Sequence, residues 1–214
     1  MAVRGWLLGI VAALALAPQA PAQSTHSKDL AAGKLLVANR NLGDPNFTES
    51  VVLLVVYQDD AVVGLILNRR SRMSISSVFA MKEAKDRSDL VYGGGPVERA
   101  SATALLRASS RPEGAAQVLD DIYLISSKSL LAKTFASPVK ADAFRVFVGY
   151  AGWTGPQLRH EVEIGSWFIF AGDAKTIFDP DPRSLWSRMI DRTESQFALA
   201  GQAGAPQGPL ARGF

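Results

Sequence analysis

The sequence contains no cysteine. Disulfide bonds, thiol catalysis, thiol-based redox switching and cysteine-based metal sites are therefore excluded. A lipid attached to a cysteine behind a signal segment is excluded for the same reason. The fold must be held by its apolar core, for which 48% of the residues are hydrophobic.

Histidine is nearly absent as well, with only His26 and His160 in the chain. His26 precedes the first apolar run, so His160 alone is expected in the folded domain. Its surroundings lack the H-E-x-x-H spacing of a zinc site, and we interpret His160 as a solvated helix residue. The sequence also lacks a Gly-x-Ser-x-Gly turn for a serine nucleophile. We expect neither a metal nor a cofactor.

Charge of one sign is in small excess only. The 23 basic and 20 acidic residues give a net charge of +3. No dense basic run of the kind that binds phosphate backbones is present. We therefore do not expect nucleic acid among the partners.

Residues 1–22 have the pattern of a secretory signal peptide. A basic residue precedes the apolar run 5–17, and Ala20-Pro21-Ala22 supplies a cleavage motif. A membrane anchor is disfavoured because a span needs ~20 apolar residues and a proline follows this shorter run. Cleavage before Gln23 removes one positive charge, so the mature charge is 3 − 1 = +2. We expect export to the bacterial periplasm, with no stable membrane span after cleavage.

The remaining chain divides into three parts by composition. Residues 23–32 are small and polar and are predicted to be a linker. Residues 33–198 are predicted to form a single domain. Residues 199–214 are rich in Gly, Pro, Ala and Gln with little to bury, which predicts a disordered tail.

Within the domain, apolar runs alternate with turn-forming segments. Strands are predicted at residues 34–38, 51–57, 61–67, 90–92, 102–106, 121–125, 144–148 and 167–170. Helices are predicted after Ser74 or Ser76, from Ser126 or Ser127 to Phe135, at 157–164, at 173–178 and around 185–190. Residues 39–47 and 107–117 are predicted loops. This order predicts a mixed α/β domain whose mixed sheet is flanked by helices.

The stretch Gly149-Tyr150-Ala151-Gly152-Trp153 stands at the centre of this pattern. We predict that the strand 144–148 enters a glycine-rich turn here and that Pro156 begins the next helix. Trp153 is either a buried core residue or part of a contact surface.

Four segments, taken in order, resemble the YqgE/AlgH family of bacterial proteins. They are 42–47 continuing into 50–54, 64–69, 94–97, and 149–153 followed by Gln157-Leu158. The resemblance spans most of residues 34–190. It implies a mixed α/β fold with a bent, partly barrel-like sheet flanked by helices. The family has no established biochemical activity, and some members are labelled transcriptional regulators.

The chain also departs from the family pattern. Members usually lack a signal peptide, which sets this chain apart from a cytoplasmic regulator. Where members often have Met-Pro, this chain has Asn39-Arg40. Members usually have a Leu-His ending to the strand after Gly-Gly-Pro-Val, whereas residues 99–107 contain no histidine.

Polar and glycine residues follow the apolar strands within these four segments. We expect eight of them to meet at one edge of the sheet as a ligand-binding surface: Asp44, Asn46, Asn68, Arg69, Gly94, Gly95, Pro96 and Trp153. An arginine beside glycines suits a small anionic ligand. In the alternative interpretation, Asp44 and Asn46 hydrogen-bond their own loop, and Asn68 with Arg69 only fastens it.

The sequence leaves three functions open. The leading hypothesis is a non-enzymatic binding or accessory protein with a small anionic ligand or a protein partner. The alternative is a hydrolase or transferase that uses carboxylates and arginine in a cleft. The third, a nucleic-acid-binding regulator, is disfavoured by the signal peptide.

Overall fold

The structure is a computed structural model that describes residues 23–203. The predicted signal peptide and residues 204–214 of the predicted tail lie outside the described residues. The side chains of Gln23 and of residues 196–203 are likewise not described.

Strands dominate the first part of the chain and helices become longer toward its end. The strands are β1 (Gln23–Ser24), β2 (Lys34–Ala38), β3 (Val51–Tyr57), β4 (Val62–Ile66), β5 (Arg70–Ser74), β6 (Leu90–Gly93), β7 (Val97–Arg107), β8 (Ala116–Leu119), β9 (Ile122–Ile125), β10 (Phe144–Trp153) and β11 (Trp167–Ala171). The helices are η1 (Ser27–Asp29), α1 (Ile75–Val78), η2 (Lys82–Ala84), α2 (Lys128–Phe135), α3 (Gly155–Glu163), α4 (Ala174–Ile177), η3 (Pro182–Ser184) and α5 (Leu185–Ala203).

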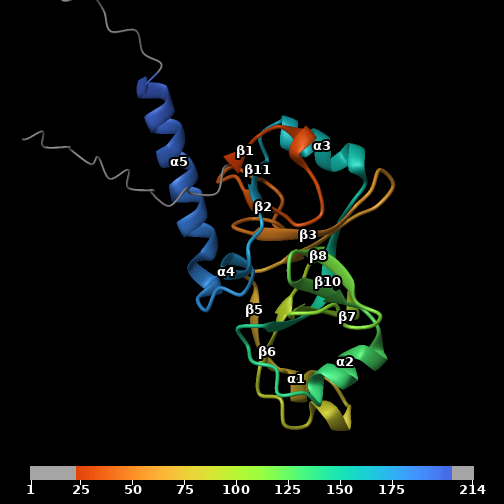
Figure 1. Ribbon diagram of the computed structural model, residues 1–214. Coiled ribbons are helices and arrows are strands. Elements are labelled where there is room, and N and C mark those ends of the chain that lie inside the picture. Colours follow the sequence, from red (N-terminus) through yellow and green to blue (C-terminus); the bar gives the residue numbers. More distant parts are fainter. Residues whose placement is uncertain (1–22, 204–214) are drawn as a thin grey trace, which may run out of the picture.

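The strands form one 11-stranded sheet that curls into a half-barrel, with the helices around it (Figure 1). Its main path runs β1-β11-β2-β3-β4-β10-β7-β9-β8, and β6 joins β5 to β10 off this path. The β6–β10 pair is parallel, and the other described pairs are antiparallel. The predicted fold class, a mixed α/β domain with a bent sheet and flanking helices, is confirmed.

Strand β10 connects the two halves of the molecule. The larger half contains β1–β4 and β11, and the smaller half contains β5–β9. The first half of β10 pairs with β7 on one edge and, at Phe147 and Val148, with β6 on the other. Its last residues, 151–153, pair with β4. Since β7 occupies the opposite edge, β6 and β4 share one edge of β10 in succession. Residues 94–96, which join β6 to β7, therefore have to cross from one edge of β10 to the other, close to its backbone.

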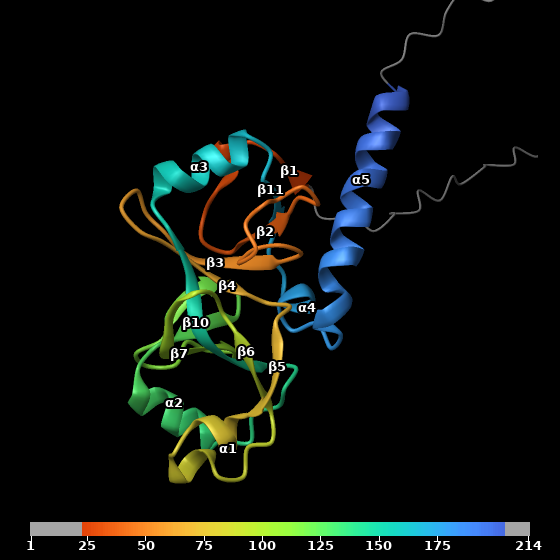
Figure 2. The same cartoon turned by 180° about the vertical axis from the view of Figure 1, so that it is seen from behind.

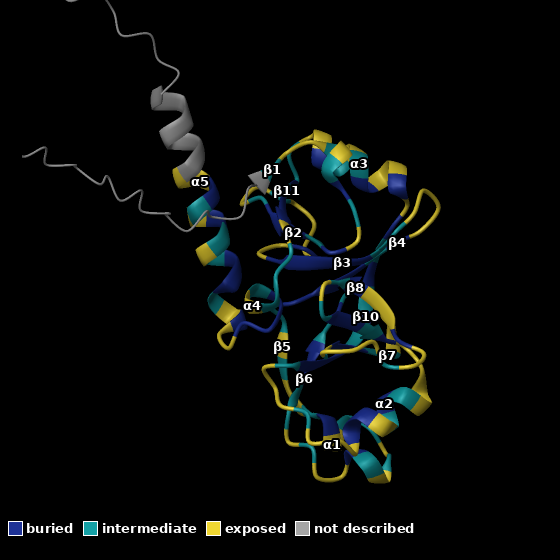
Figure 3. Ribbon diagram, in the orientation of Figure 1, coloured by how far each residue is buried: buried dark blue, intermediate teal, exposed yellow. Residues whose placement is uncertain are grey.

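The buried hydrophobic residues form two clusters, and Figure 3 shows buried residues in both halves of the molecule. The larger cluster lies between the sheet of β2, β3, β4 and β11 and the helices α3 and α5. The smaller lies beneath α1 and α2 and includes Ile75, Phe135 and Phe144. The continuous apolar runs of β2 and β3 are explained by this burial on both faces.

Helix α5 lies along one flank of the larger half and extends past it (Figure 2). Trp186 of α5 is buried, and its Nε1 donates to the main-chain oxygen of Ala38 at 2.8 Å. Arg40 pairs with Asp191 and Glu194 of the same helix, each at 2.6 Å. The start of α5 is thus fixed to the end of β2.

The predicted glycine-rich turn is wrong. Residues 149–153 continue β10 up to Trp153, and a register shift between Val148 and Tyr150 marks a bulge at Gly149 (φ 69°). The glycines serve close backbone contacts within a sheet, which produces the same sequence pattern as a turn. The helix that follows begins at Gly155 and is capped by Thr154.

Four other predictions need correction. Residues 23–32 are not merely a linker, because β1 pairs with β11 and Leu30 is buried. Strands β5 and β8 were not predicted, and β7 begins five residues earlier than expected, at Val97. Residues 199–203, assigned to a disordered tail, belong to α5. Within the described residues, none of the helices combines the length and the apolarity that crossing a membrane requires.

Candidate functional site

The candidate site is a cavity of about 240 Å³ at the place where β5, β6 and β10 meet the loop after β2. Its lining consists of Asn46, Arg69, Gly93, Gly95, Pro96, Arg99 and Val148, and we call it the Arg69 pocket. It contains residues from three of the four segments that were expected to converge. The fourth segment, around Trp153, does not line it.

Arg69 is the half-buried cation of this pocket. Its guanidinium makes no hydrogen bond or ion pair to any residue between 23 and 203. Burial lowers the pKa of Arg69, and the nearby charge of Asp44 raises it in part. Arginine nevertheless remains charged in proteins, so a desolvated cation without a direct partner faces the cavity.

Arg99 adds a second positive charge to the same cavity. It is exposed in the first half of β7 and, among the described residues, forms no ion pair. Sequence reasoning missed Arg99 because the predicted strand began only at Ala102. The available signal was its position three residues after Pro96 in a stretch with few apolar residues.

The glycine segment 93–95 is required by the strand crossing. The amide of Gly93 donates to the oxygen of Arg69 at 2.9 Å, and that of Gly94 donates to the oxygen of Val148 at 2.8 Å. A Cβ on Gly94 would lie 2.2 Å from the oxygen of Gly149, and one on Gly95 would lie 2.1 Å from the carbonyl carbon of Tyr150. With these amides already engaged, the segment does not offer a row of N–H groups to an anion. The two arginines are therefore the lining groups best placed to contact an anion.

The loop residues behave partly as the alternative interpretation predicts, in which they only fasten their own loop. We call this the clamp interpretation. The amide of Asn46 donates to Oδ1 of Asp44 at 2.8 Å, which closes a turn within the loop. Asn68 accepts from the amide of Val51 at 2.9 Å and donates to the oxygen of Glu49 at 2.8 Å. Asn68 thus fastens the loop, whereas Asn46 also reaches the pocket wall.

Trp153 lies in the core, away from the pocket. It is 6% exposed and stacks on Phe47, with their ring centroids 5.1 Å apart. Its Nε1 donates to Oε2 of Glu161 at 3.0 Å, and the same oxygen accepts from Trp167 Nε1 at 2.9 Å. Trp153 therefore supports the loop through Phe47 and has no part in the pocket surface.

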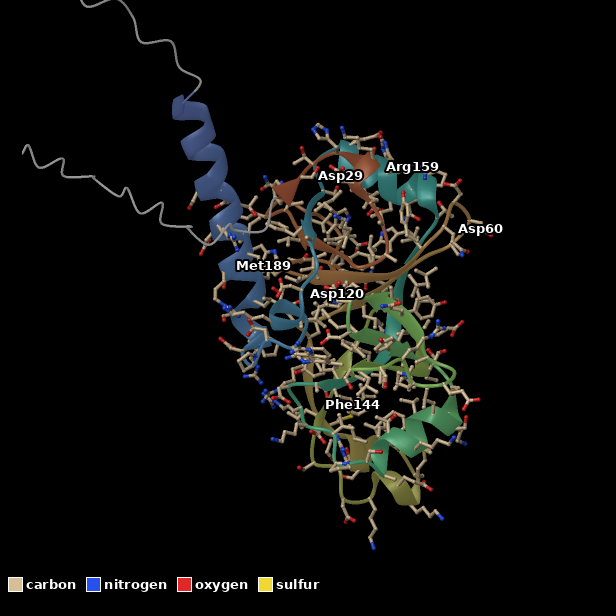
Figure 4. The ribbon with its side chains drawn as sticks, in the orientation of Figure 1. Asp29, Asp60, Asp120, Phe144, Arg159 and Met189 are labelled. Atoms are coloured by element: carbon tan, nitrogen blue, oxygen red, sulfur yellow. The ribbon has the colours of Figure 1, made fainter. Side chains whose placement is uncertain are left out.

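A larger cavity of about 350 Å³ lies between the start of α5 and β11 and contains two carboxylates. Asp173 caps α4 by accepting from the amide of Thr176 at 2.9 Å. Asp179 accepts from Arg188 at 2.9 Å and from the amide of Asp181 at 2.8 Å. Met189, on the face of α5 nearest the sheet, forms part of the apolar wall (Figure 4). Both carboxylates are therefore engaged in holding the fold.

No group of three or more His, Asp or Glu side chains able to hold a metal ion occurs in the part of the chain that is described. His160 is exposed on α3. The geometry thus offers an arginine-lined cavity and no evident catalytic array within residues 23–203.

Known proteins share both the sequence and the fold. A family model described as AlgH-like matches residues 35–198. A UPF0301 protein of Thermobifida fusca is 34% identical over 176 residues, which cover 78% of this chain and 89% of the relative. The UPF0301 protein CT0663 of Chlorobaculum tepidum is 29% identical over 178 residues, covering 83% and 93%.

Two solved structures have the same fold. The solution structure of the AlgH protein from Pseudomonas aeruginosa superimposes with a TM-score of 0.62 at 24% identity, covering 86% of this chain and 97% of that one. The crystal structure of protein DIP2367 from Corynebacterium diphtheriae gives a TM-score of 0.61 at 22% identity, covering 77% and 87%. On the family match and the identity to the UPF0301 proteins, the chain belongs to the AlgH-like family.

Proposed function

We propose that this chain is an exported, non-enzymatic binding protein that holds a small anionic ligand in the Arg69 pocket. The observation that carries the proposal is the state of Arg69, a half-buried cation that faces a cavity without a hydrogen-bonded partner among the described residues. Burying a charge without a partner is unfavourable. A bound anion would give the guanidinium a partner and remove that cost, which favours anion binding.

The lining favours binding over chemistry. Planar guanidinium groups match carboxylate and phosphate oxygens, and two of them meet here. None of the lining residues is a carboxylate, a histidine or a hydroxyl-bearing residue. General acid–base catalysis and nucleophilic attack need such groups within hydrogen-bonding reach of the substrate. A cavity of about 240 Å³ also suits a small ligand.

The hydrolase or transferase alternative has weaker support. The cleft beside α5 does combine carboxylates and arginines, but Asp173 and Asp179 are committed to capping and ion pairing. A role in nucleic-acid binding has weaker support still, because the charge expected after signal cleavage is 3 − 1 = +2.

Export is the second part of the proposal. Cleavage before Gln23 would leave β1 intact, since that strand begins at Gln23. Mass spectrometry of protein produced in a bacterial host with a secretion pathway should show a mature N-terminus at Gln23. A full-length chain that stays in the cytosol would contradict export while leaving the pocket proposal standing.

The binding proposal is tested with Arg69→Ala and, as its matched control, Arg72→Ala. Arg72 is exposed on β5 and lines neither the Arg69 pocket nor the other cavities described. We use inorganic phosphate and citrate as probes in calorimetric titrations at an ionic strength of about 0.15 M, where the Debye length is about 8 Å. Loss of a charge-assisted hydrogen bond predicts that Arg69→Ala weakens the better-bound probe by about tenfold or more. Arg72→Ala should change its affinity by less than about twofold.

The clamp interpretation predicts the opposite pattern. If Arg69 only fastens the loop, Arg69→Ala should lower the thermal midpoint clearly and leave probe affinity unchanged. The binding proposal instead predicts a melting temperature close to that of the original chain, because the Arg69 guanidinium makes no hydrogen bond within the described structure.

A further inference from the structure

A second arginine, Arg145, is buried in the other half of the molecule. It lies in β10 opposite Leu105 of β7 and is 5% exposed. Its guanidinium lies over the ring of Tyr92, 4.8 Å from the centroid, and its Nη2 donates to the main-chain oxygen of Asp179. Its Nε and Nη1 are buried and have no hydrogen-bond partner among the described residues.

The charge of Arg145 is poorly matched by its surroundings. The carboxylate of Asp179, whose charge raises the pKa of Arg145, already accepts hydrogen bonds from Arg188 and from the amide of Asp181. Burial is the main cause that lowers the pKa of Arg145, while Tyr92 and Asp179 raise it and the like charge of Arg70 lowers it further. A buried cation with unsatisfied donors is costly, so its retention calls for a partner.

Arg145 lines a cavity of about 210 Å³ beside β6, which we call the Arg145 pocket. The polar side chains of its lining are Arg70, Ser88, Asp89, Tyr92 and Arg145. Within residues 23–203, the hydroxyls of Ser88 and Tyr92 make no hydrogen bond. The carboxylate of Asp89 is held by Arg87 Nε at 2.8 Å. The pocket therefore presents two cations and two free hydroxyl groups against one engaged carboxylate.

We propose that the Arg145 pocket is a second anion site, in which Arg70, Arg145, Ser88 and Tyr92 receive a small oxyanion of the carboxylate or phosphate type. The two pockets lie on opposite sides of β6. Neighbouring residues of the chain line different pockets. Arg69 and Gly93 line the Arg69 pocket, whereas Arg70 and Tyr92 line the Arg145 pocket. This alternation follows from the period of two in an extended chain. The second site is independent of the proposed function of the first.

The test removes the first site and then probes the second. In the full chain carrying Arg69→Ala and Arg99→Ala, inorganic phosphate and acetate are titrated by calorimetry. We expect saturable binding of at least one anion, and the tighter of the two identifies the ligand class. Adding Arg70→Ala should weaken it by about tenfold or more, because a direct cationic contact is lost. Adding Arg72→Ala, which removes the same charge from the same strand outside the pocket, should change it by less than about twofold.

The side-chain resonance of Arg145 Nε–H gives a direct second readout without mutating a buried residue. An oxyanion held in the Arg145 pocket adds a negative charge beside the guanidinium and should shift this resonance in saturable fashion. The proposal is overturned by absence of saturable binding in the double variant, by equal losses with Arg70→Ala and Arg72→Ala, or by an Arg145 resonance that saturating anion leaves unchanged.

Discussion

At the scale of single residues, two sets of arginines differ in their partners. Arg40, Arg159 and Arg188 hydrogen-bond carboxylates of other elements and help hold the fold. In Figure 4, Arg159 of α3 lies near the tip of the hairpin that carries Asp60. The carboxylate that pairs with Arg159 belongs to the preceding residue, Asp59. Arg69 and Arg99 have no such partner among the described residues and face one cavity. This division separates structural arginines from the candidates for ligand recognition.

Trp153 belongs to the structural residues. Trp153→Ala removes a side chain that is 6% exposed, together with its stacking on Phe47 and its hydrogen bond to Glu161. We expect a loss of about 3–5 kcal/mol in the free energy of unfolding, measured by urea denaturation. Ile164→Ala is the control, because Ile164 is 64% exposed and should change stability by less than about 0.5 kcal/mol. A loss below about 1 kcal/mol for Trp153→Ala would contradict its placement in the core.

At the scale of elements, the crossing of the 93–96 segment over β10 sets the position of the pocket. Gly95→Ala would place a Cβ 2.1 Å from the carbonyl carbon of Tyr150 at a φ of +158°. The contact is with backbone that has little room to move, so we expect destabilisation of about 3 kcal/mol or more in chemical unfolding. Gly43→Ala, with nothing within 4 Å of the added carbon, should stay within about 0.5 kcal/mol of the original chain. Similar stabilities of the two variants would mean that the strands do not cross as described.

Helix α5 is held partly by an ion pair that responds to pH. The hydrogen bond from Arg40 is the main cause that holds the pKa of Glu194 below its usual value of 4.5. A carboxyl whose pKa is lowered on folding contributes stability above its unfolded pKa, and the contribution disappears as pH falls through the folded pKa. Glu194→Gln should therefore melt at a lower temperature than the original chain at neutral pH.

This difference in melting temperature should shrink as the pH falls below about 4.5 and vanish once the carboxylate is protonated in the original chain. Because the pair is exposed, the difference is expected to be small and to shrink in high salt. Glu113→Gln, at an exposed position without an ion pair in the described structure, provides the control and should show no such pH dependence. A Glu194→Gln difference that persists unchanged in acid would argue against the pair.

Which strands could be predicted depended on their burial. Strands β2 and β3 are continuous apolar runs because both of their faces are covered, and they were predicted within one residue. Strand β5 has the sequence Arg-Ser-Arg-Met-Ser with no buried residue, so neither apolar periodicity nor propensity indicates it. It forms because β6 offers it a partner, which is a tertiary effect. Gly149 misled the prediction because a bulge and a turn call for the same residue.

At the scale of the whole molecule, β10 unites two half-sheets, and both arginine-lined cavities lie along it. Membership of the AlgH-like family and the curled mixed sheet were predicted from four short segments and are confirmed. Four of the eight expected site residues line the Arg69 pocket, namely Asn46, Arg69, Gly95 and Pro96. Trp153 was wrongly assigned to the ligand-binding surface, because the sequence does not show that this last residue of β10 packs into the core. Arg99 was missed because the exposed start of β7 has no apolar pattern.

The central claim is that an anion binds in the Arg69 pocket, and chemical-shift mapping on the isotope-labelled chain tests it most directly. Titration with the better-bound of phosphate and citrate should produce saturable shifts in the amides of Gly93 and Gly95 and in the Nε–H groups of Arg69 and Arg99. These residues line one cavity and respond together only if the anion occupies it. Saturable shifts confined to other parts of the molecule, or no saturable shift at these four residues, would contradict the account.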